Sequence, residues 1–275
     1  MRYAERNITS VTDLVTLLAE DHSTLNADTS VNHESVPIVP VWYRGMGDHS
    51  LKLETSMART MNALPREQAL MNRFKQNALR FLQRIPQEEW EWLFLMRHHG
   101  LPSRLLDWTE TPLIGLYFAV TSVTQNGPTE LEGELDLEDG VLWCLIPSEL
   151  NNIAGGSPRS VLDIPMFTPE EKFFWPYLPE SVSGPSASKQ VTPVAGIAAR
   201  DTERIQAQQG VFTVNALNPI AIEDVGSGEH VWRYRIPKDA KNKIREELRL
   251  LGISSLAVFP HLDNVTRLAR SQTNV

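Results

Sequence analysis

The first hydrophobic pattern along the chain is helical. Its apolar residues recur at three- and four-residue spacing and so share one side of a helix: Val11, Leu14, Val15, Leu17 and Leu18. Thr12 and Asp13 provide a helix start, because short polar side chains and acids suit the first turn. The polar stretch from Asp21 to Ser35 predicts a loop after this helix.

A strand is predicted at Val41 to Arg44, where the residues are β-branched or aromatic. Pro37 and Pro40 exclude regular strand from the residues before it, since proline cannot donate to a ladder. Gly45 and Gly47 are expected to end the strand.

Three helices are predicted to follow, each with a proline in or before its first turn. They span about Pro65 to Arg84, Pro86 to Gly100, and Thr109 to Thr124. Gly100 is placed to end the second, because glycine accepts the left-handed conformation that closes many helices.

The second half of the chain mixes strands and helices without regular alternation. Strands are predicted at 141–146 and near 194–199, 211–214 and 231–236, and helices near 238–251 and 261–270. The acidic segment 129–140 and the segment 181–189 predict surface loops. This order favours a single α+β domain with a mixed or antiparallel sheet flanked by helices.

Composition narrows the class of protein. The chain has 275 residues, 41% of them hydrophobic, which fits one large domain or two small ones. No apolar run approaches the roughly 18 residues of a membrane span, and the N-terminal residues lack a signal-peptide core, so we expect a cytoplasmic protein. The net charge of −8 disfavours a protein that coats nucleic acid without sequence preference.

Side chains that could bind a ligand or act in catalysis are most concentrated between Arg97 and Thr109. Asp107 could orient a histidine or accept a salt bridge from Arg104, and the pair could equally serve only to fix a turn while Trp108 fills the core.

His98 and His99 lie at a predicted helix end and point in different directions. We expect His99 to face a cleft and His98 to pack beside Phe94, with two core histidines as the alternative. Adjacent histidines are a poor metal pair, so no metal is expected here.

Two further stretches could contact a ligand. Arg44 ends a hydrophobic strand before Gly45, where a planar guanidinium suits a phosphate or carboxylate; an ordinary edge arginine is the alternative. Gln206, Gln208 and Gln209 precede a short strand and could bind a ligand amide or ribose hydroxyl, or cap exposed backbone. The one cysteine, Cys144, lies in an apolar strand and is predicted to be a core thiol.

These pieces together resemble the FRG domain family, named for a Phe-Arg-Gly tripeptide. The tripeptide reads Tyr43-Arg44-Gly45 here, and the most specific match is HHGLPSRLLDWTETPLIGLYFA at 98–119. Two weaker matches are Gln208-Gln209-Gly210-Val211-Phe212 and the closing segment from Phe259 to Asp263. Arg97 stands where the family usually has glutamine. The resemblance implies a domain over 36–265, after an N-terminal helix and loop at 1–35 and before a tail at 266–275.

The FRG layout is similar to that of ADP-ribosyltransferases, which implies NAD as a substrate and an architecture of that type. By this resemblance Arg44, Arg104 and Thr109 would contact the nucleotide, and His99, Asp107 and Gln209 would act in catalysis. Thr55 and Ser56 are an alternative to Thr109 as the middle motif. In ADP-ribosyltransferases the position of Gln209 normally holds glutamate, and glutamine cannot carry its charge.

Two functions therefore remain open. One is ADP-ribosyl transfer to an unknown protein or nucleic-acid target, in a bacterial toxin or antiphage system, as the resemblance implies. The other is a non-catalytic module that uses the same cationic pocket to bind a nucleotide, a nucleic acid or a protein. The geometry tests them: we ask whether Arg44, His99, Asp107 and Gln209 converge on one cleft, and both functions would fail if Arg44 and the 98–109 turn lay on opposite sides.

Overall fold

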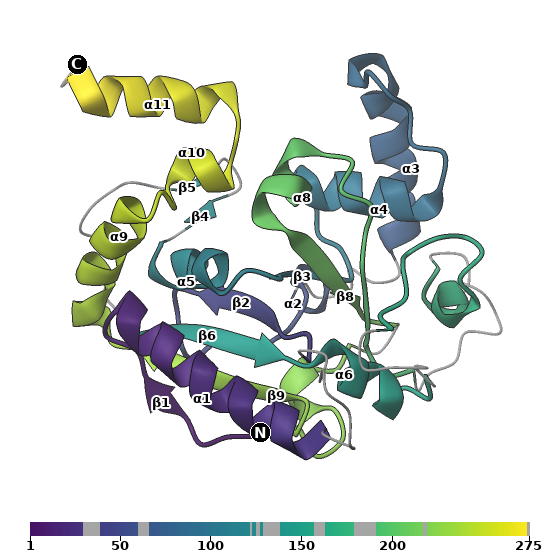
Figure 1. The fold of residues 1–275 in the computed structure, drawn as a ribbon. Coiled ribbons are helices and arrows are strands. Elements are labelled where there is room, and N and C mark those ends of the chain that lie inside the picture. Colours follow the sequence, from purple (N-terminus) through teal and green to yellow (C-terminus); the bar gives the residue numbers. More distant parts are fainter. Residues whose placement is uncertain are drawn as a thin grey trace.

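A seven-stranded mixed sheet forms the centre of the structure, which is a computed structural model (Figure 1). It describes residues 1–29, 39–59, 66–121, 123–124, 127–128, 138–156, 163–178, 191–216 and 219–273. The strands of this sheet are β1 (Arg6–Asn7), β2 (Trp42–Met46), β3 (Leu105–Thr109), β6 (Gly140–Leu145), β7 (Val194–Gly196), β8 (Gly210–Val214) and β9 (Val231–Ile236). A separate ribbon pairs β4 (Val123–Thr124) with β5 (Gly127–Pro128).

Neighbouring strands follow the order β1-β9-β6-β2-β3-β8-β7. Every neighbouring pair is antiparallel except β1 and β9, which are parallel. The central pair is unusual. Strands β2 and β3 pair at a single position, Tyr43 with Thr109, whereas β2 pairs with β6 over five residues. The sheet therefore opens between β2 and β3 beyond this one point.

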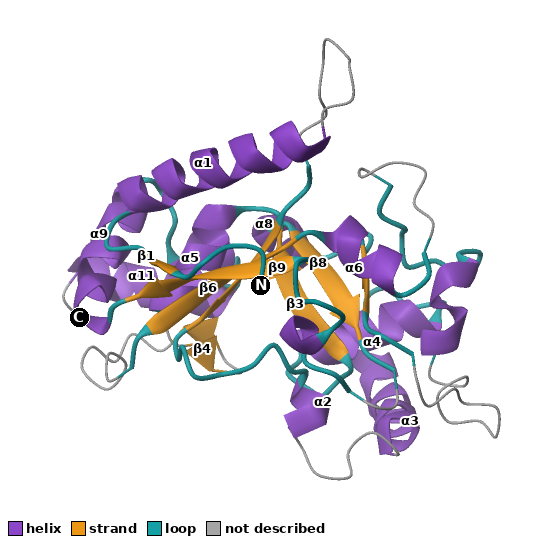
Figure 2. Ribbon diagram, turned by 90° about the horizontal axis from the view of Figure 1, so that it is seen from below, coloured by secondary structure: helices purple, strands orange, loops and turns teal. Residues whose placement is uncertain are grey.

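The longer helices are α1 (Val11–Thr29), α3 (Glu67–Ala78), α4 (Glu89–His98), α5 (Pro112–Val120), α9 (Lys241–Leu250) and α11 (Leu262–Thr273). The shorter ones are α2 (Ser56–Arg59), α6 (Pro147–Ile153), α8 (Glu203–Gln208) and α10 (Ser255–Val258), with 3-10 turns at η2 (Leu79–Phe81), η3 (Lys172–Tyr177), η4 (Ile222–Asp224) and η5 (Lys238–Ala240). Helices α9 and α3 lie at opposite ends of the molecule, and α1 runs along one side of the strands (Figures 1 and 2).

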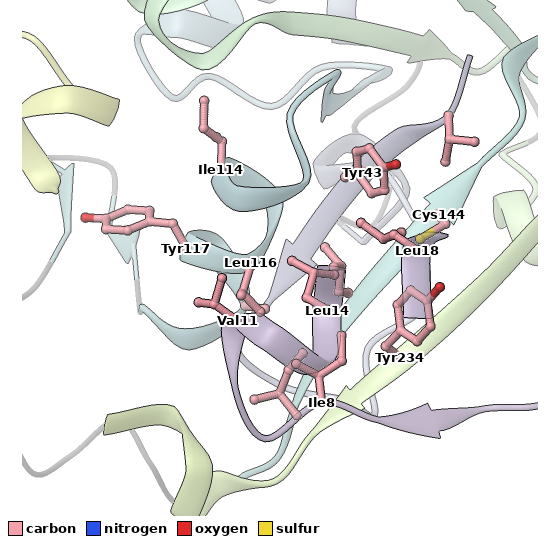
Figure 3. Close-up of a cluster of buried hydrophobic side chains, with 14 of the residues drawn as sticks. Ile8, Val11, Leu14, Leu18, Tyr43, Ile114, Leu116, Tyr117, Cys144 and Tyr234 are labelled. Carbon is pink, nitrogen blue, oxygen red and sulfur yellow. The ribbon is translucent and has the colours of Figure 1, made fainter. Parts of the chain in front are cut away.

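The largest apolar cluster joins α1, α5 and α9 to one face of the sheet. Figure 3 shows Leu18 of α1 near the strand residue Cys144, and Val11 near Leu116 of α5. A second cluster packs α3, α4, η3 and α8 against β3, β7 and β8, and a third covers the opposite face of the strands. Burial of these surfaces is the main favourable contribution to folding.

The single α+β domain predicted from the sequence is confirmed, and so is the mixed sheet. The strand at 141–146 and the three later strands form within about three residues of their predicted bounds. Cys144 is a buried core thiol, as expected. Gly100 follows the end of α4 with φ 78, the conformation for which glycine was predicted there.

Four local predictions are wrong. Helix α1 continues to Thr29, so the loop predicted to begin at Asp21 does not form there. Asp21 instead binds Arg6 and the Tyr234 hydroxyl, and these contacts hold this turn of the helix against the sheet. Gly45 lies inside β2 and does not end it. Residues 105–109 form a central strand where a turn was expected, and 203–208 form a helix that was not predicted. The loop predicted at 181–189 and most of the acidic segment lie outside the described residues.

The predicted boundary between 35 and 36 lies outside the described residues, but the N-terminal segment belongs to the same packed structure. The N-terminal segment contributes β1 to the sheet and α1 to its largest core cluster. The boundary placed between 265 and 266 falls within α11.

Gly45 explains how close α5 lies to the centre of the sheet. A Cβ atom there would lie 1.9 Å from the Gly115 carbonyl oxygen and 2.4 Å from the Ala119 nitrogen, both of which are backbone atoms of α5. A side chain at this strand position would therefore push the helix off β2.

We predict that Gly45→Ala lowers the free energy of unfolding by about 1–3 kcal/mol or more, because overpacking against backbone cannot relax by rotation. Urea unfolding measures it. Gly210→Ala is the matched control, since its Cβ would meet Ile205 only at ordinary contact distances of 3.5–3.7 Å. Equal losses in the two variants would contradict the close helix–strand contact.

Candidate functional site

Asp107 of β3 lies at the centre of the candidate site and binds Arg97 of α4. The Arg97 Nε donates to both carboxylate oxygens, at 3.2 and 2.9 Å, and Nη2 donates to Oδ2. The remaining Arg97 nitrogen, Nη1, donates to the Ser56 hydroxyl at 3.2 Å. This fork-like geometry is the strongest that an arginine and a carboxylate form.

Arg44 of β2 reaches the same aspartate from the other side. Its Nη1 donates to the Asp107 carbonyl oxygen at 2.6 Å and lies 3.8 Å from Oδ2. The opening between β2 and β3 provides the room for this side chain. Its Nε is buried without a hydrogen-bond partner among the described residues.

The two arginines keep Asp107 ionised. Burial alone would raise the pKa of this carboxyl, but the charge and hydrogen bonds of Arg97, followed by the charge of Arg44, lower it to about 2. The charge of Asp107 in turn raises the pKa of Arg97, against the effect of burial. Burial lowers the pKa of Arg44 to about 10, with Asp107 opposing and Arg97 and Arg59 adding to the decrease. A carboxylate held this way is a weak proton acceptor and serves to organise the arginines.

A pocket opens beside this ion pair, between α4, β3, α8 and β8. It is a small pocket that is open to solvent, with a cavity volume of about 30 Å³. The polar lining consists of Arg97, His98, Asp107, Arg204 and Gln208, and the apolar lining includes Phe94, Trp108, Ile205 and Phe212. Flat apolar walls beside several cations suit a ligand with both a ring and an anionic group.

The two neighbouring histidines are placed opposite to the expectation. His98 lines the pocket, whereas His99 is exposed and its ring lies 6.0 Å from that of Phe74. The His98 ring also contacts His261, 5.8 Å away, and its Nδ1 is buried without a partner in the described part of the chain. Burial, and then Arg204 and the two other histidines, lower the pKa of His98 to about 4, so the ring is neutral at pH 7.

The end of helix α8 places Gln208, and not the predicted Gln209, at the pocket. Gln208 lines the pocket and donates to the Val258 carbonyl oxygen at 3.2 Å. Gln209 is exposed, caps α8 with φ 45, and its carbonyl accepts from the Glu110 nitrogen at 3.1 Å. Gln209 therefore lies between α8 and β8, with its backbone and not its side chain in a described contact.

Arg104 and Thr109, both predicted to contact the nucleotide, are buried. The Arg104 side chain is 1% exposed and its guanidinium donates to Glu67 at 2.6 Å and to the carbonyls of Asn215 and Tyr177. The suggested Arg104–Asp107 pair is thus wrong, because Arg104 turns toward α3 and Arg97 takes its place. The Thr109 hydroxyl donates to the Gln208 carbonyl and accepts from the Thr111 nitrogen, so it ties β3 to α8 and to the start of α5.

Sequence reasoning missed Arg204 as a site residue and assigned His98 to the core. Arg204 stands four residues before Gln208, a spacing that places both on one face of a helix, but 203–208 was not recognised as helical. The unusual Arg97 was noted as a cation near the site, and only the structure shows that it pairs with Asp107.

Among the described residues, no group of three or more histidine, cysteine, aspartate or glutamate side chains is arranged to hold a metal ion. None of the described helices is long and apolar enough to cross a bilayer.

We predict that Arg104 stabilises the fold. Arg104→Met should lower the free energy of unfolding by about 3–5 kcal/mol, because it leaves Glu67 as a buried charge without its partner. Chemical denaturation measures this loss. Arg200→Met is the control, since its pair with Glu110 is exposed and worth about 0–1 kcal/mol. A loss below 1 kcal/mol in Arg104→Met would contradict the structural role.

One comparison with known proteins matches the part of the chain that holds the Asp107 ion pairs. The model of the FRG domain matches residues 39–127, which include β2, α4 and β3 and therefore Arg44, Arg97 and Asp107. No curated protein and no solved structure matches the chain. Residues 39–127 of the chain are therefore similar to the FRG domain.

Proposed function

We propose that the pocket binds a phosphate-bearing nucleotide, with NAD as the first candidate, and that the chain is an ADP-ribosyltransferase. One observation carries the binding proposal: Arg44, Arg97 and Arg204, from three different elements, surround the single carboxylate of Asp107. Because cations outnumber the anion in a half-buried site, the site favours an added negative charge. The aromatic lining offers a surface for a base or nicotinamide ring.

The arrangement of the strands supports the transfer reaction. Arg44, Thr109 and Gln209 lie on or at the ends of β2, β3 and β8, which are neighbours in the sheet. The FRG resemblance to ADP-ribosyltransferases places its three motif residues on such strands.

In this reaction the bond between ribose C1′ and nicotinamide breaks, the acceptor bonds to C1′, and the acceptor loses a proton. His98 is the stronger base of the two titratable pocket residues, since the pKa of Asp107 is about 2, but with a pKa of about 4 it is also a weak proton acceptor at pH 7.

A non-catalytic nucleotide-binding module is the alternative, and the glutamines favour it. No glutamate lines the pocket within the described residues, and the glutamine that does, Gln208, cannot carry the negative charge that would stabilise an oxocarbenium ion. In such a module, nucleotide binding would change the affinity for a protein or nucleic-acid partner. For either function we propose a cytoplasmic role in a bacterial toxin or antiphage system, which rests on the resemblance alone.

The test separates binding from transfer. Isothermal titration with NAD and ADP-ribose should show binding to the wild type, and mass spectrometry of cell extract incubated with the protein and isotope-labelled NAD should show labelled ADP-ribose on a macromolecule. Binding without transfer would select the module. No binding of either nucleotide would contradict the proposal.

Asp107→Asn should weaken nucleotide binding, because Arg97 and Arg44 then lose the charge that positions them. Glu110→Gln is the matched control on the same segment, because Glu110 pairs with the exposed Arg200. Circular dichroism establishes that each variant is folded before its binding is compared.

A further inference from the structure

The arginines of the site differ in how many of their donors are already used. Arg97 directs Nε and Nη2 to Asp107 and Nη1 to Ser56, so all three of its nitrogens are occupied. Arg44 directs Nη1 to the Asp107 carbonyl, and its Nε is enclosed by protein. Arg97 thus has no nitrogen without a described partner, and Arg44 does not line the pocket.

Arg204 differs from both. Only its Nη1 has a described hydrogen bond, to the His98 carbonyl oxygen at 3.1 Å, and among the described residues no carboxylate oxygen lies within 4.0 Å of its guanidinium. The guanidinium carbon lies over the Phe259 ring, 5.1 Å from its centre, which leaves the fork in a fixed place. Arg204 therefore keeps donors for a ligand.

Arg204 is half-buried, and among the described residues it has no ion-pair partner within 4.0 Å. Burial lowers its pKa, while the charge of Asp107 raises the pKa by more than the charge of Arg97 lowers it. An anion in the pocket would supply the direct partner that this desolvated guanidinium lacks, and neutral His98, whose Nδ1 has no described partner, lies beside it to complete the contact.

We propose that Arg204 is the arginine that directly contacts the phosphate of the bound nucleotide, with His98 beside it, while Arg44 and Arg97 are held by Asp107. The inference rests on the proposed nucleotide binding and deepens it. It assigns the ligand's anionic group to the α4–α8 side of the pocket and its ring to the apolar wall. The ligand class is a nucleotide with at least one phosphate, in preference to the bare nucleoside.

Two probes that differ only in phosphate test the assignment. Isothermal titration would compare ADP with adenosine for the wild type, Arg204→Gln and Arg204→Lys. We expect the wild type to bind ADP more tightly than adenosine. Arg204→Gln should lose roughly tenfold or more in ADP affinity and leave adenosine unchanged, because charge-assisted hydrogen bonds are worth that factor. Arg204→Lys should retain only part of the preference, since lysine lacks the planar fork.

Controls separate this inference from the proposed function. Arg200→Gln removes an exposed arginine shortly before α8 and should bind ADP as the wild type does. If the wild type binds ADP and Arg204→Gln binds it equally well, the assignment of Arg204 is overturned and the nucleotide pocket stands. If the wild type binds neither ADP nor NAD, both proposals fail. A parallel loss of adenosine binding in Arg204→Gln would also overturn the assignment, because the residue would then shape the whole pocket.

A spectroscopic readout adds a second, independent criterion. Phosphorus-31 resonances of ADP should shift on binding to the wild type, and this shift should disappear in Arg204→Gln at concentrations where adenosine still binds. A preserved shift would show that another residue contacts the phosphate.

Discussion

The ion pairs of Asp107 hold together the parts of the chain that form the site. Its carboxylate binds Arg97 from α4, and its carbonyl and carboxylate draw in Arg44 from β2. Removal of Asp107 would leave two half-buried cations facing each other, and like charges in such a site repel strongly. The positions of α4, β2 and β3 relative to one another therefore depend on this residue.

The opening between β2 and β3 makes this arrangement possible. An ordinary antiparallel pair would fill the space with backbone hydrogen bonds, but these strands are in register only at Tyr43 and Thr109. The Arg44 side chain takes up part of the backbone hydrogen bonding that the missing pairs would supply. Gly45 and Gly115 allow α5 to lie directly on β2 on the other face, so the strand is fixed while its arginine is free to reach across. A binding site placed where strands separate has a rigid base and an accessible edge.

Much of the fold could be predicted from the sequence, because hydrophobic spacing and glycine or proline positions determine local structure. The buried strand around Cys144 and the helix ending at Gly100 were predicted for these reasons. The strand at Leu105–Thr109 was missed, since its polar centre, Asp107, and the preceding proline and glycine are typical of a turn. It forms a strand because it pairs with β8 along its whole length, while Arg97 and Arg44 compensate the charge of Asp107; both are long-range effects that no local pattern contains.

The site was predictable only in part for the same reason. The chemistry of Arg44 and Asp107 as neighbours could be expected, and the structure brings them together. Which histidine enters the pocket depends on the rotation of the last turn of α4, and the role of Arg104 depends on Glu67, which lies 37 residues away in sequence. Periodicity alone does not fix either of these.

The titration of Asp107 tests the central claim most directly. Carbon-detected NMR of its carboxyl group, in uniformly labelled protein, would give the pKa without a mutation. The account predicts a midpoint near pH 2, well below the ordinary value of about 3.9, so that the stabilising contribution of this carboxylate is complete above about pH 4 and is lost as the pH falls through 2. A midpoint at or above the ordinary value would contradict the account, because Asp107 would then not be held by the two arginines.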